Sequence, residues 1–397
     1  MDQRIWLLLL RLRIRKRRRM AMMQYMMYHY IAYVLKTPKR DSCLSGEMWI
    51  NERMRGNHDA FVETFRMPRF VFCALLHTVI TTGGISDSKY ITAKEQLCMF
   101  LYFAGHHASS TNIQERFQHS GETVSRYLRR VVAALRNMSQ RYIRLPSPTA
   151  AVHPVIATNP KFSPFFDNCR MAVDGTQIPV WVPANEAAPF HGRKGLAMNV
   201  MAACDFDLQF TYVLAGWEGT ASDSKVYADA ITKGLAPDDK KWDIMDGGFA
   251  LSNKCLTPYR GTRYHLKEFG SGRQKPKNKE ELFNLRHAQL RNCVERIFGV
   301  LKMRFPVLSS AVRYNYSFQV DLVIALCTVH NFARRHDTEG DRFVLGAENH
   351  DEEQDPDPRN HEEHNGDNSE AKAWRDGIAA AMWTQYQTTL RNRRRRS

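Results

Sequence analysis

Four acidic residues stand at positions where strands and helices would bring carboxylates together. Asp174 lies within an apolar, β-branched run, Asp246 directly follows another such run, and Glu295 lies at the edge of an apolar helical stripe. Asp223 opens a helix between the two other aspartates. Carboxylate oxygens are the ligands that Mg²⁺ prefers, and two such ions can clamp the attacking and leaving oxygens of a phosphodiester. The four residues therefore predict a divalent-cation site, with Asp174, Asp246 and Glu295 as its catalytic residues.

The elements that must position these residues alternate between strand and helix. Four short apolar runs predict strands, at 169–183, 196–204, 209–214 and 242–245. A helix opens at Asp223, and a long helix carries Glu295. An RNase H-like nuclease domain has this order of elements: three strands, a helix, a strand and then helices. A single aspartate after a strand is more often a turn or cap residue, so the prediction depends on several carboxylates matching this order.

Six segments of the chain resemble the PIF/Harbinger transposases and the nucleases derived from them. They are AVDGTQIPV at 172–180, GRKG at 192–195, AACDFDLQFTYVLAGWEGTASDS at 202–224, LTPYRGTRYHLKEF at 256–269, LFNLRHAQLRNCVERIFGVLKMRFPVL at 282–308 and VHNF at 329–332. The resemblance implies an RNase H-like DDE catalytic domain that acts on DNA with Mg²⁺ or Mn²⁺. It assigns the triad to Asp174, Asp246 and Glu295 and adds Asp223 as a fourth metal-site residue.

Two departures from the family pattern lie beside these carboxylates. Ser222 stands where the family usually has His, and Asp246-Gly247-Gly248-Phe249 replaces the usual Asp-Ala-Gly-Tyr. Neither departure removes a carboxylate. The resemblance therefore implies a transposase or a transposase-derived DNA endonuclease, and in a full transposase strand transfer would follow cleavage. The alternative is a domesticated factor that binds DNA or protein and no longer cuts.

Basic residues near the acidic set predict contacts with DNA phosphates. Arg193 and Lys194 lie between two glycines, while Arg291 and Lys302 lie on the helix of Glu295. Phosphate contacts are made mostly by lysine and arginine. Surface solvation is the alternative for each of these residues.

The sequence predicts helices throughout 46–145. The last part of this region predicts a short polar helix, a turn, and a longer helix that Ser120 would cap. The longer helix has an apolar face and an opposite row of arginines, which is a helix-turn-helix pattern. This pattern predicts DNA contacts at Ser125, Arg126 and Arg129, with an ordinary helical bundle as the alternative. The expected fold class is α/β, an RNase H-like DDE domain over 168–335 preceded by this all-α domain.

Charge is distributed unevenly along the chain. The 397 residues carry a formal net charge of +16, but residues 348–370 hold ten acidic residues and one basic residue, so the remainder carries +25. We expect a basic peripheral arm over 1–45, an acidic disordered segment over 336–370, and a short helix with a basic tail over 371–397. The basic arm and the basic tail favour nucleic acid as a partner and the nucleus as the location.

The eight cysteines contain no C-x-x-C pair, which favours reduced, buried thiols over a zinc site or a disulfide framework. No apolar run approaches the roughly 20 residues that a membrane span needs, so no membrane is expected as a partner. The family resemblance further implies a homodimer and a Myb/SANT-like partner protein supplied in trans.

Overall fold

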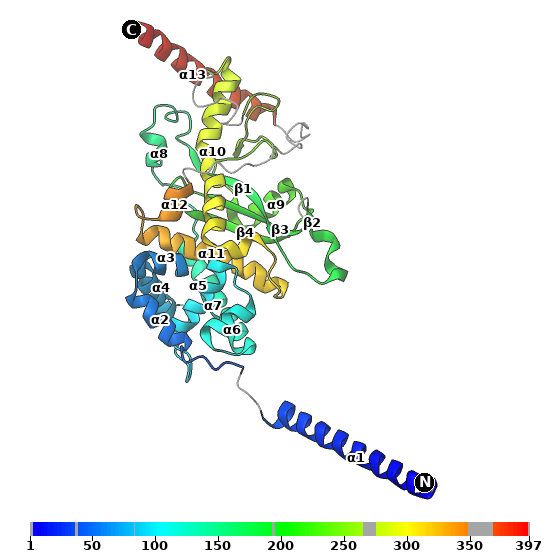
Figure 1. Cartoon of the computed structure of the whole chain (residues 1–397). Helices are drawn as coiled ribbons and strands as arrows, with labels where there is room; N and C mark the ends of the chain where they lie inside the picture. Colours follow the sequence, from blue (N-terminus) through cyan, green and yellow to red (C-terminus); the bar gives the residue numbers. More distant parts are fainter. Residues whose placement is uncertain are drawn as a thin grey trace. The chain divides into compact units, whose positions relative to one another are not determined.

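The structure is a computed structural model that describes residues 3–35, 39–82, 84–192, 195–264, 275–347 and 368–395. It divides into two compact units, 1–45 and 46–397, which are described separately (Figure 1). The predicted acidic segment lies mostly at 348–367, outside the described residues, as do Arg193 and Lys194.

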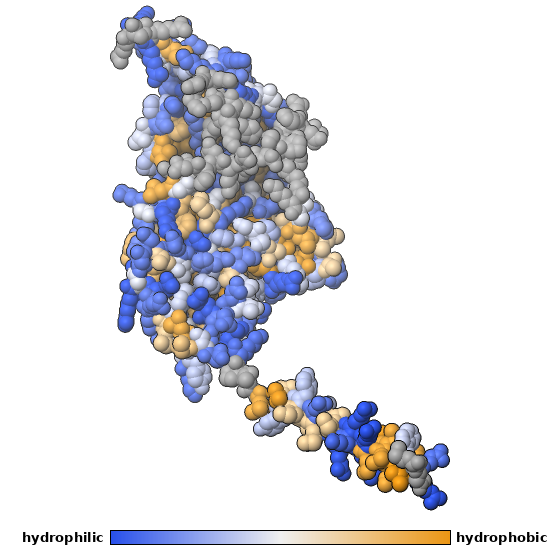
Figure 2. Space-filling view, viewed as in Figure 1, coloured by the Kyte–Doolittle hydropathy of each residue, from blue (hydrophilic) through white to orange (hydrophobic). Residues whose placement is uncertain are grey.

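The first unit is one helix. Helix α1 (Gln3–His29) continues into the π-helical turn η1 (Tyr30–Val34), and all of its described side chains are exposed. Hydrophobic and hydrophilic side chains lie next to one another along this unit (Figure 2). Neither α1 nor any other helix in the described part of the chain has an apolar stretch long enough to cross a membrane.

The second unit begins with a bundle of helices, which confirms the helical region predicted for this part of the chain. Its helices are α2 (Gly46–Arg55), α3 (His58–Phe65), α4 (Arg69–Thr82), α5 (Ala93–His106), α6 (Ser110–Phe117) and α7 (Gly121–Tyr142). Side chains of Asn57, Thr92, Ser109 and Ser120 cap four of these helices by accepting a backbone N–H. Trp49 packs edge-on against Phe65 and Phe117 in the core that these helices share.

A mixed sheet follows the helices, so the observed fold class is α/β. Its strands are β1 (Cys169–Pro179), β2 (His191–Gly192), β3 (Gly195–Cys204), β4 (Phe210–Glu218), β5 (Trp242–Ile244) and β6 (Cys255–Leu256). Strand β3 pairs antiparallel with both β1 and β4, whereas β5 is parallel to β1 and β6 is parallel to β5. Short β2 pairs with the start of β3.

Strand β4 extends four residues beyond the predicted end at residue 214. Residues Ala215-Gly216-Trp217-Glu218 lay outside the predicted strand, but this segment pairs with the first half of β3. A register shift beside Val200 accommodates Gly216, whose φ of 102° is a backbone conformation that favours glycine. Pairing with β3 therefore extends β4 beyond the predicted end.

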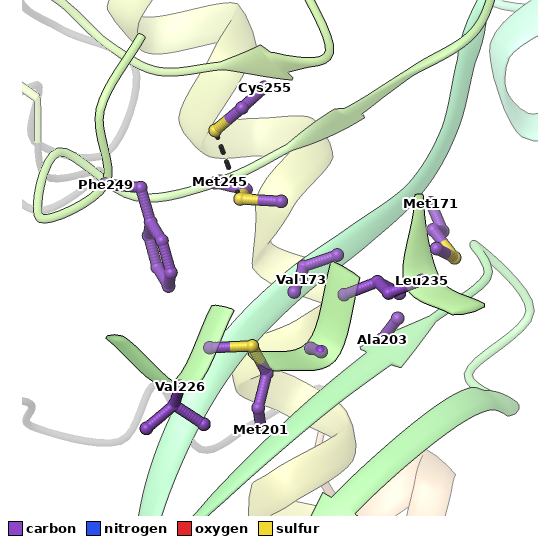
Figure 3. Packing of buried hydrophobic residues seen from close by; sticks show 10 residues of the cluster. Met171, Val173, Met201, Ala203, Val226, Leu235, Met245, Phe249 and Cys255 are labelled. Carbon is purple, nitrogen blue, oxygen red and sulfur yellow. Dashed lines mark hydrogen bonds between the residues drawn. The ribbon is translucent and has the colours of Figure 1, made fainter. Parts of the chain in front are cut away.

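Helices cover both faces of the sheet. Helix α9 (Asp223–Ala230) and the turn η4 (Ile231–Leu235) cover one face, where Val226 packs with Val173, Met201 and Met245 (Figure 3). Helix α10 (Lys279–Arg304) packs on β1 and β3 (Figure 1). Because side chains alternate along a strand, Val173 faces α9 and Asp174 faces α10.

Shorter elements and the C-terminal helices complete the unit. They are α8 (Pro154–Ala157), η2 (Ala184–Glu186), η3 (Ala188–Phe190), η6 (Pro306–Ser309), α11 (Tyr316–His336), α12 (Arg342–Ala347) and α13 (Ser369–Arg394). Within the segment expected to be disordered, 336–370, residues 342–347 form α12 and residues 369–370 begin α13. Asp341, which precedes α12, is buried in an ion pair with Arg304. Helix α13 is longer than the short helix expected, and Trp374 anchors it on Trp242 of the sheet.

Six of the eight cysteines are buried, whereas Cys43 and Cys73 are exposed, and all eight are free thiols. The predicted burial therefore holds for six cysteines and not for Cys43 and Cys73.

Asn331 of α11 joins the helical bundle to the sheet. Its side-chain amide donates to the carbonyl oxygens of Tyr142 on α7 (2.9 Å) and Phe210 on β4 (2.7 Å), and its oxygen accepts the Phe210 N–H (2.8 Å). The side chain is fully buried. One residue therefore satisfies three backbone groups at the junction of three elements.

Replacement of Asn331 by alanine is expected to lower the free energy of unfolding by about 2–3 kcal/mol, because buried backbone groups lose their partners. Urea denaturation of the two proteins measures this difference. Asn137→Ala, at an exposed position of α7, is the matched control and should change stability by less than about 0.5 kcal/mol. Equal midpoints for the two variants would contradict the role given to Asn331.

Candidate active site

Three of the predicted acidic residues converge because of how β1, β5 and α10 pack. Ala172 of β1 pairs with Ile244 of β5 in parallel register, so Asp174 and Asp246 each lie two residues further along. Glu295 comes from α10, which packs across β1. The structure thus brings together side chains that are separated by more than 120 positions in sequence.

One guanidinium binds all three carboxylates. Arg291 Nη2 donates to Asp174 Oδ2 at 2.7 Å and lies 3.6 Å from Asp246 Oδ2. Arg291 Nη1 donates to Glu295 Oε1, one helical turn along α10. The Arg291 side chain is only 4% exposed. The prediction that Arg291 contacts DNA is therefore not supported by this arrangement, because the carboxylates already surround the guanidinium.

Backbone groups fix the two aspartates. The Gly175 N–H donates to Asp174 Oδ1 at 2.8 Å, and the Gly248 N–H donates to Asp246 Oδ1. Arg260 holds the turn after Asp246 by donating to the carbonyl oxygens of Gly247 (2.9 Å) and Phe249 (2.8 Å). The orientation of both carboxylates is thus set by the loop and strand that carry them.

A second ion pair aligns the strands that carry the aspartates. Arg170 of β1 donates to both oxygens of Asp243 on β5, with Nε–Oδ1 at 2.9 Å and Nη2–Oδ2 at 2.7 Å. The Asp243 side chain is fully buried and the Arg170 side chain is 7% exposed. This two-point contact fixes the register of β1 on β5, and with it the separation of Asp174 from Asp246.

Burial dominates the electrostatics of the site. It raises the pKa of Asp174 to about 7, aided by the neighbouring carboxylates of Asp246 and Glu295 and opposed by Arg291. Burial alone would lower the pKa of Arg291, but Tyr264 and the three carboxylates outweigh it and raise that pKa. Arg291 therefore stays protonated and is the counter-charge of the carboxylates that surround it.

Tyr264 and His287 border this cluster, although neither was among the predicted site residues. The Tyr264 hydroxyl lies 3.3 Å from His287 Nδ1, and His287 Nε2 lies 3.1 Å from the Leu256 carbonyl oxygen. Burial lowers the pKa of His287 to about 3, so the ring is neutral. The only signal in the sequence was the spacing of four residues between His287 and Arg291 on α10.

Asp223 lies beside the cluster but on the other face of β1. A Cβ atom built on Gly175 would lie 3.0 Å from Asp223 Oδ1, so the absence of a side chain at 175 permits this approach. Position 175 faces opposite to Asp174 along the strand. Asp223 is therefore close to the site in space, but Arg291 binds the other three carboxylates and not this one.

The family departures lie in two different environments. Ser222 precedes α9 and its side chain makes no capping hydrogen bond. Phe249 is buried against Tyr227 in the cluster of Figure 3. The ring at position 249 therefore belongs to the hydrophobic core on the α9 face, whereas the three joined carboxylates face α10.

Two groups of the residues predicted to contact DNA lie in the described part of the chain: Lys302 on α10, and three residues on α7. Lys302 Nζ lies 3.2 Å from Thr176 Oγ1, on the face of β1 that also carries Asp174. On α7, Ser125 forms a side-chain hydrogen bond with Tyr314, and the Arg129 guanidinium carbon lies 5.8 Å from the centroid of the Tyr314 ring. Arg126 forms an ion pair with Glu122 on the same helix. The structure thus places Lys302 near the carboxylates, whereas part of the predicted helix-turn-helix surface of α7 contacts Tyr314.

The carboxylates fit a divalent cation in chemical type. Three oxygen-donor side chains face one point, and hard cations such as Mg²⁺ bind such donors. In the observed arrangement the guanidinium occupies that point, and the described residues contain no group of three acidic, histidine or cysteine side chains spaced to hold an ion. Asp174, Asp246 and Glu295 are therefore suitable ligands once the guanidinium has moved away.

Comparison with known proteins gives the family of this part of the chain. Residues 173–331 match the family described as DDE superfamily endonuclease, and this range contains all four predicted acidic residues. The chain contains a DDE superfamily endonuclease domain. The resemblance predicted from the motifs is thereby confirmed, and the endonuclease domain comprises the sheet, α10 and most of α11.

Further matches extend beyond the endonuclease domain. Residues 41–137 match a domain of unknown function, DUF8040. The chain is 24% identical to "Protein ALP1-like" of Arabidopsis thaliana over 300 residues, which cover 68% of this chain and 70% of the relative. It is 22% identical to "Putative nuclease HARBI1" of Xenopus laevis over 263 residues, covering 63% and 70% of the two chains. No solved structure matches the chain.

Proposed function

We propose that this chain is a divalent-metal-dependent endonuclease of the Harbinger type, which hydrolyses DNA phosphodiester bonds. The observation that carries the proposal is the convergence of Asp174, Asp246 and Glu295 from β1, the end of β5 and α10. The match to the DDE superfamily endonucleases supports the same reaction class.

The proposed architecture is RNase H-like. In its support, the strands run in the order β4-β3-β1-β5-β6, with the first three antiparallel and the last two parallel to β1. Apart from the two-residue strands β2 and β6, the elements follow the order expected from the sequence: β1, β3, β4, α9, β5 and α10.

The residues of the site have separable roles in this proposal. Asp174, Asp246 and Glu295 would hold the metal, with Asp223 as a fourth acidic group across β1. Bound Mg²⁺ or Mn²⁺ would supply an activated water and neutralise charge on the phosphate. Lys302 would bind a phosphate oxygen beside the carboxylates, and the N–H groups of Gly175 and Gly248 keep the aspartates oriented.

DNA recognition would use surfaces outside the carboxylate cluster. Arg126, Arg129 and Arg130 are exposed on one face of α7 and offer a basic surface for phosphates. A Myb/SANT-like protein in trans, a homodimer and a nuclear location belong to this proposal through the Harbinger resemblance.

A specific observation favours a second candidate, a factor that binds DNA and does not cut it. Arg291 already neutralises part of the acidic cluster, so the observed arrangement needs no metal to stay folded. A chain fixed in this arrangement would keep its basic surfaces and lose its chemistry.

The proposed function is tested by incubating supercoiled plasmid with the full chain in Mg²⁺, in Mn²⁺ and in EDTA. Nicking is expected with either metal and not in EDTA, because the carboxylates alone provide no electrophile. Asp174→Asn should remove the nicking, whereas Asp207→Asn, an exposed carboxylate in the turn after β3, should retain it. Salt-sensitive plasmid binding without nicking in any metal would favour the second candidate.

A further inference from the structure

Arg291 lies where a cation is needed and where, in the proposed function, a metal would bind. We propose that the Arg291 guanidinium is a built-in competitor of the metal, which must withdraw from the carboxylates before a divalent cation binds them. This inference rests on the proposed function, because it concerns the same carboxylates. It adds that Arg291 regulates the binding of the metal to them.

The geometry makes the competition direct. The two terminal nitrogens of Arg291 bind Asp174 at 2.7 Å and Glu295, and the first of them also lies 3.6 Å from Asp246. The three carboxylates that contact Arg291 are the groups that would hold the metal in the proposed function. A guanidinium and a divalent cation repel each other, and they cannot share one set of oxygens at these distances.

The charge balance explains why the metal-free protein keeps the guanidinium inside. Three carboxylates within reach of one another repel each other when they are ionised, and the Asp174 side chain is only 13% exposed. Like charges held together with little water are costly unless a counter-charge is present. Arg291 supplies that charge from α10 itself, so the metal-free site is held together without any external ion.

Only the carboxylates hold the guanidinium of the arginine in the described part of the chain. Its Nε atom is buried and makes no hydrogen bond in the described part of the chain, so only the two terminal nitrogens hold the side chain in place. Its stem comes from a rigid helix, four residues before Glu295. A change of side-chain rotamer therefore frees the carboxylates without moving the backbone of α10.

The competition is measured as the affinity of the full chain for Mn²⁺. The electron paramagnetic resonance signal of the unbound ion gives the fraction of Mn²⁺ that is bound. Arg291→Gln is expected to bind Mn²⁺ about tenfold or more tightly than the wild type, a coupling of ordinary size between two ligands of one site. Arg296→Gln removes a positive charge from the same helix, and the ion pairs of the three carboxylates in the described part of the chain are with Arg291, so its affinity should stay near that of the wild type. Circular dichroism establishes that each variant is folded.

A measurement on the wild type covers the case in which Arg291→Gln does not fold. Phenylglyoxal modifies accessible guanidinium groups, and mass spectrometry locates the modified arginines. Arg291 should be protected in EDTA and become modified when Mn²⁺ saturates the protein. Unchanged protection at saturation would overturn the proposal, because the metal would then bind with the guanidinium still in place.

The outcomes separate this proposal from the proposed function. Equal Mn²⁺ affinity in the wild type and Arg291→Gln overturns the competition but leaves a metal-dependent nuclease intact. Binding by Arg291→Gln alone supports the competition and counts against metal-dependent activity in the isolated wild-type chain. Absence of binding in both proteins, each folded, overturns both proposals.

Discussion

Glu295→Gln is expected to lower the rate of metal-dependent DNA cleavage by about a hundredfold or more, since a metal-bound carboxylate contributes several kcal/mol to such a reaction. Glutamine has nearly the same shape as glutamate but lacks its charge, so the change is chemical and not steric. Glu295 suits this test because it lies on α10 and does not interrupt a strand.

The fold should survive the Glu295→Gln substitution. The Glu295 side chain is 36% exposed, and ion pairs with such access to water contribute no more than about 1 kcal/mol to stability. Asp174 and Asp246 would still pair with Arg291. Thermal unfolding and plasmid binding are therefore expected to stay close to those of the wild type.

The matched control is Glu280→Gln, at the other end of α10. Glu280 is similarly accessible, with 30% of its side chain exposed, and it lies in the first turn of the helix. Its substitution should leave the cleavage rate unchanged. Full cleavage activity in Glu295→Gln would show that Glu295 is not a catalytic residue and would leave only Asp174 and Asp246 in that role.

Arg304→Met is expected to destabilise the second unit by about 3–5 kcal/mol, the usual cost of leaving one member of a buried ion pair alone. Arg304 is 1% exposed and donates to Asp341, which is 6% exposed. Methionine fills much of the volume of arginine, so the loss reflects the stranded carboxylate more than a cavity. Urea denaturation followed by circular dichroism measures the change.

Two comparisons identify the cause of that loss. Arg136→Met breaks a pair with Asp321 in which both side chains are 42% exposed, so it should cost no more than about 1 kcal/mol. The double variant Arg304→Met with Asp341→Asn should recover part of the loss, because no charge is then left buried. Similar losses from Arg304→Met and Arg136→Met would show that burial does not strengthen the first pair.

The stability from the Arg304–Asp341 pair should also depend on acid. Burial alone would raise the pKa of Asp341, but Arg304 reverses this effect and lowers the pKa below its ordinary value. Such a carboxylate contributes stability above its unfolded pKa, near 3.9, and the contribution disappears as the pH falls through the lower folded value. The difference between wild type and Arg304→Met should therefore narrow below about pH 4.

The sequence alone determined the kinds of element and the order of the carboxylates. Apolar periodicity separated the helical region from the strands, because side chains repeat every two residues in a strand and about every 3.6 in a helix. The same patterns placed Asp174 on a strand, Asp246 after a strand and Glu295 on a helix. The ends of the strands were less well determined: the predicted strand ended at 214, whereas pairing with β3 extends β4 to Glu218.

Only the tertiary structure decided what lies among the carboxylates. The spacing of four residues puts Arg291 beside Glu295 on α10, but the packing of α10 on β1 determines that the same guanidinium also reaches Asp174. Asp223 was expected with the other three, and the packing of α9 against Gly175 puts it on the opposite face of β1. Sequence spacing defines neighbours along one element. Contacts between elements depend on which faces bury each other, and that is a property of the whole fold.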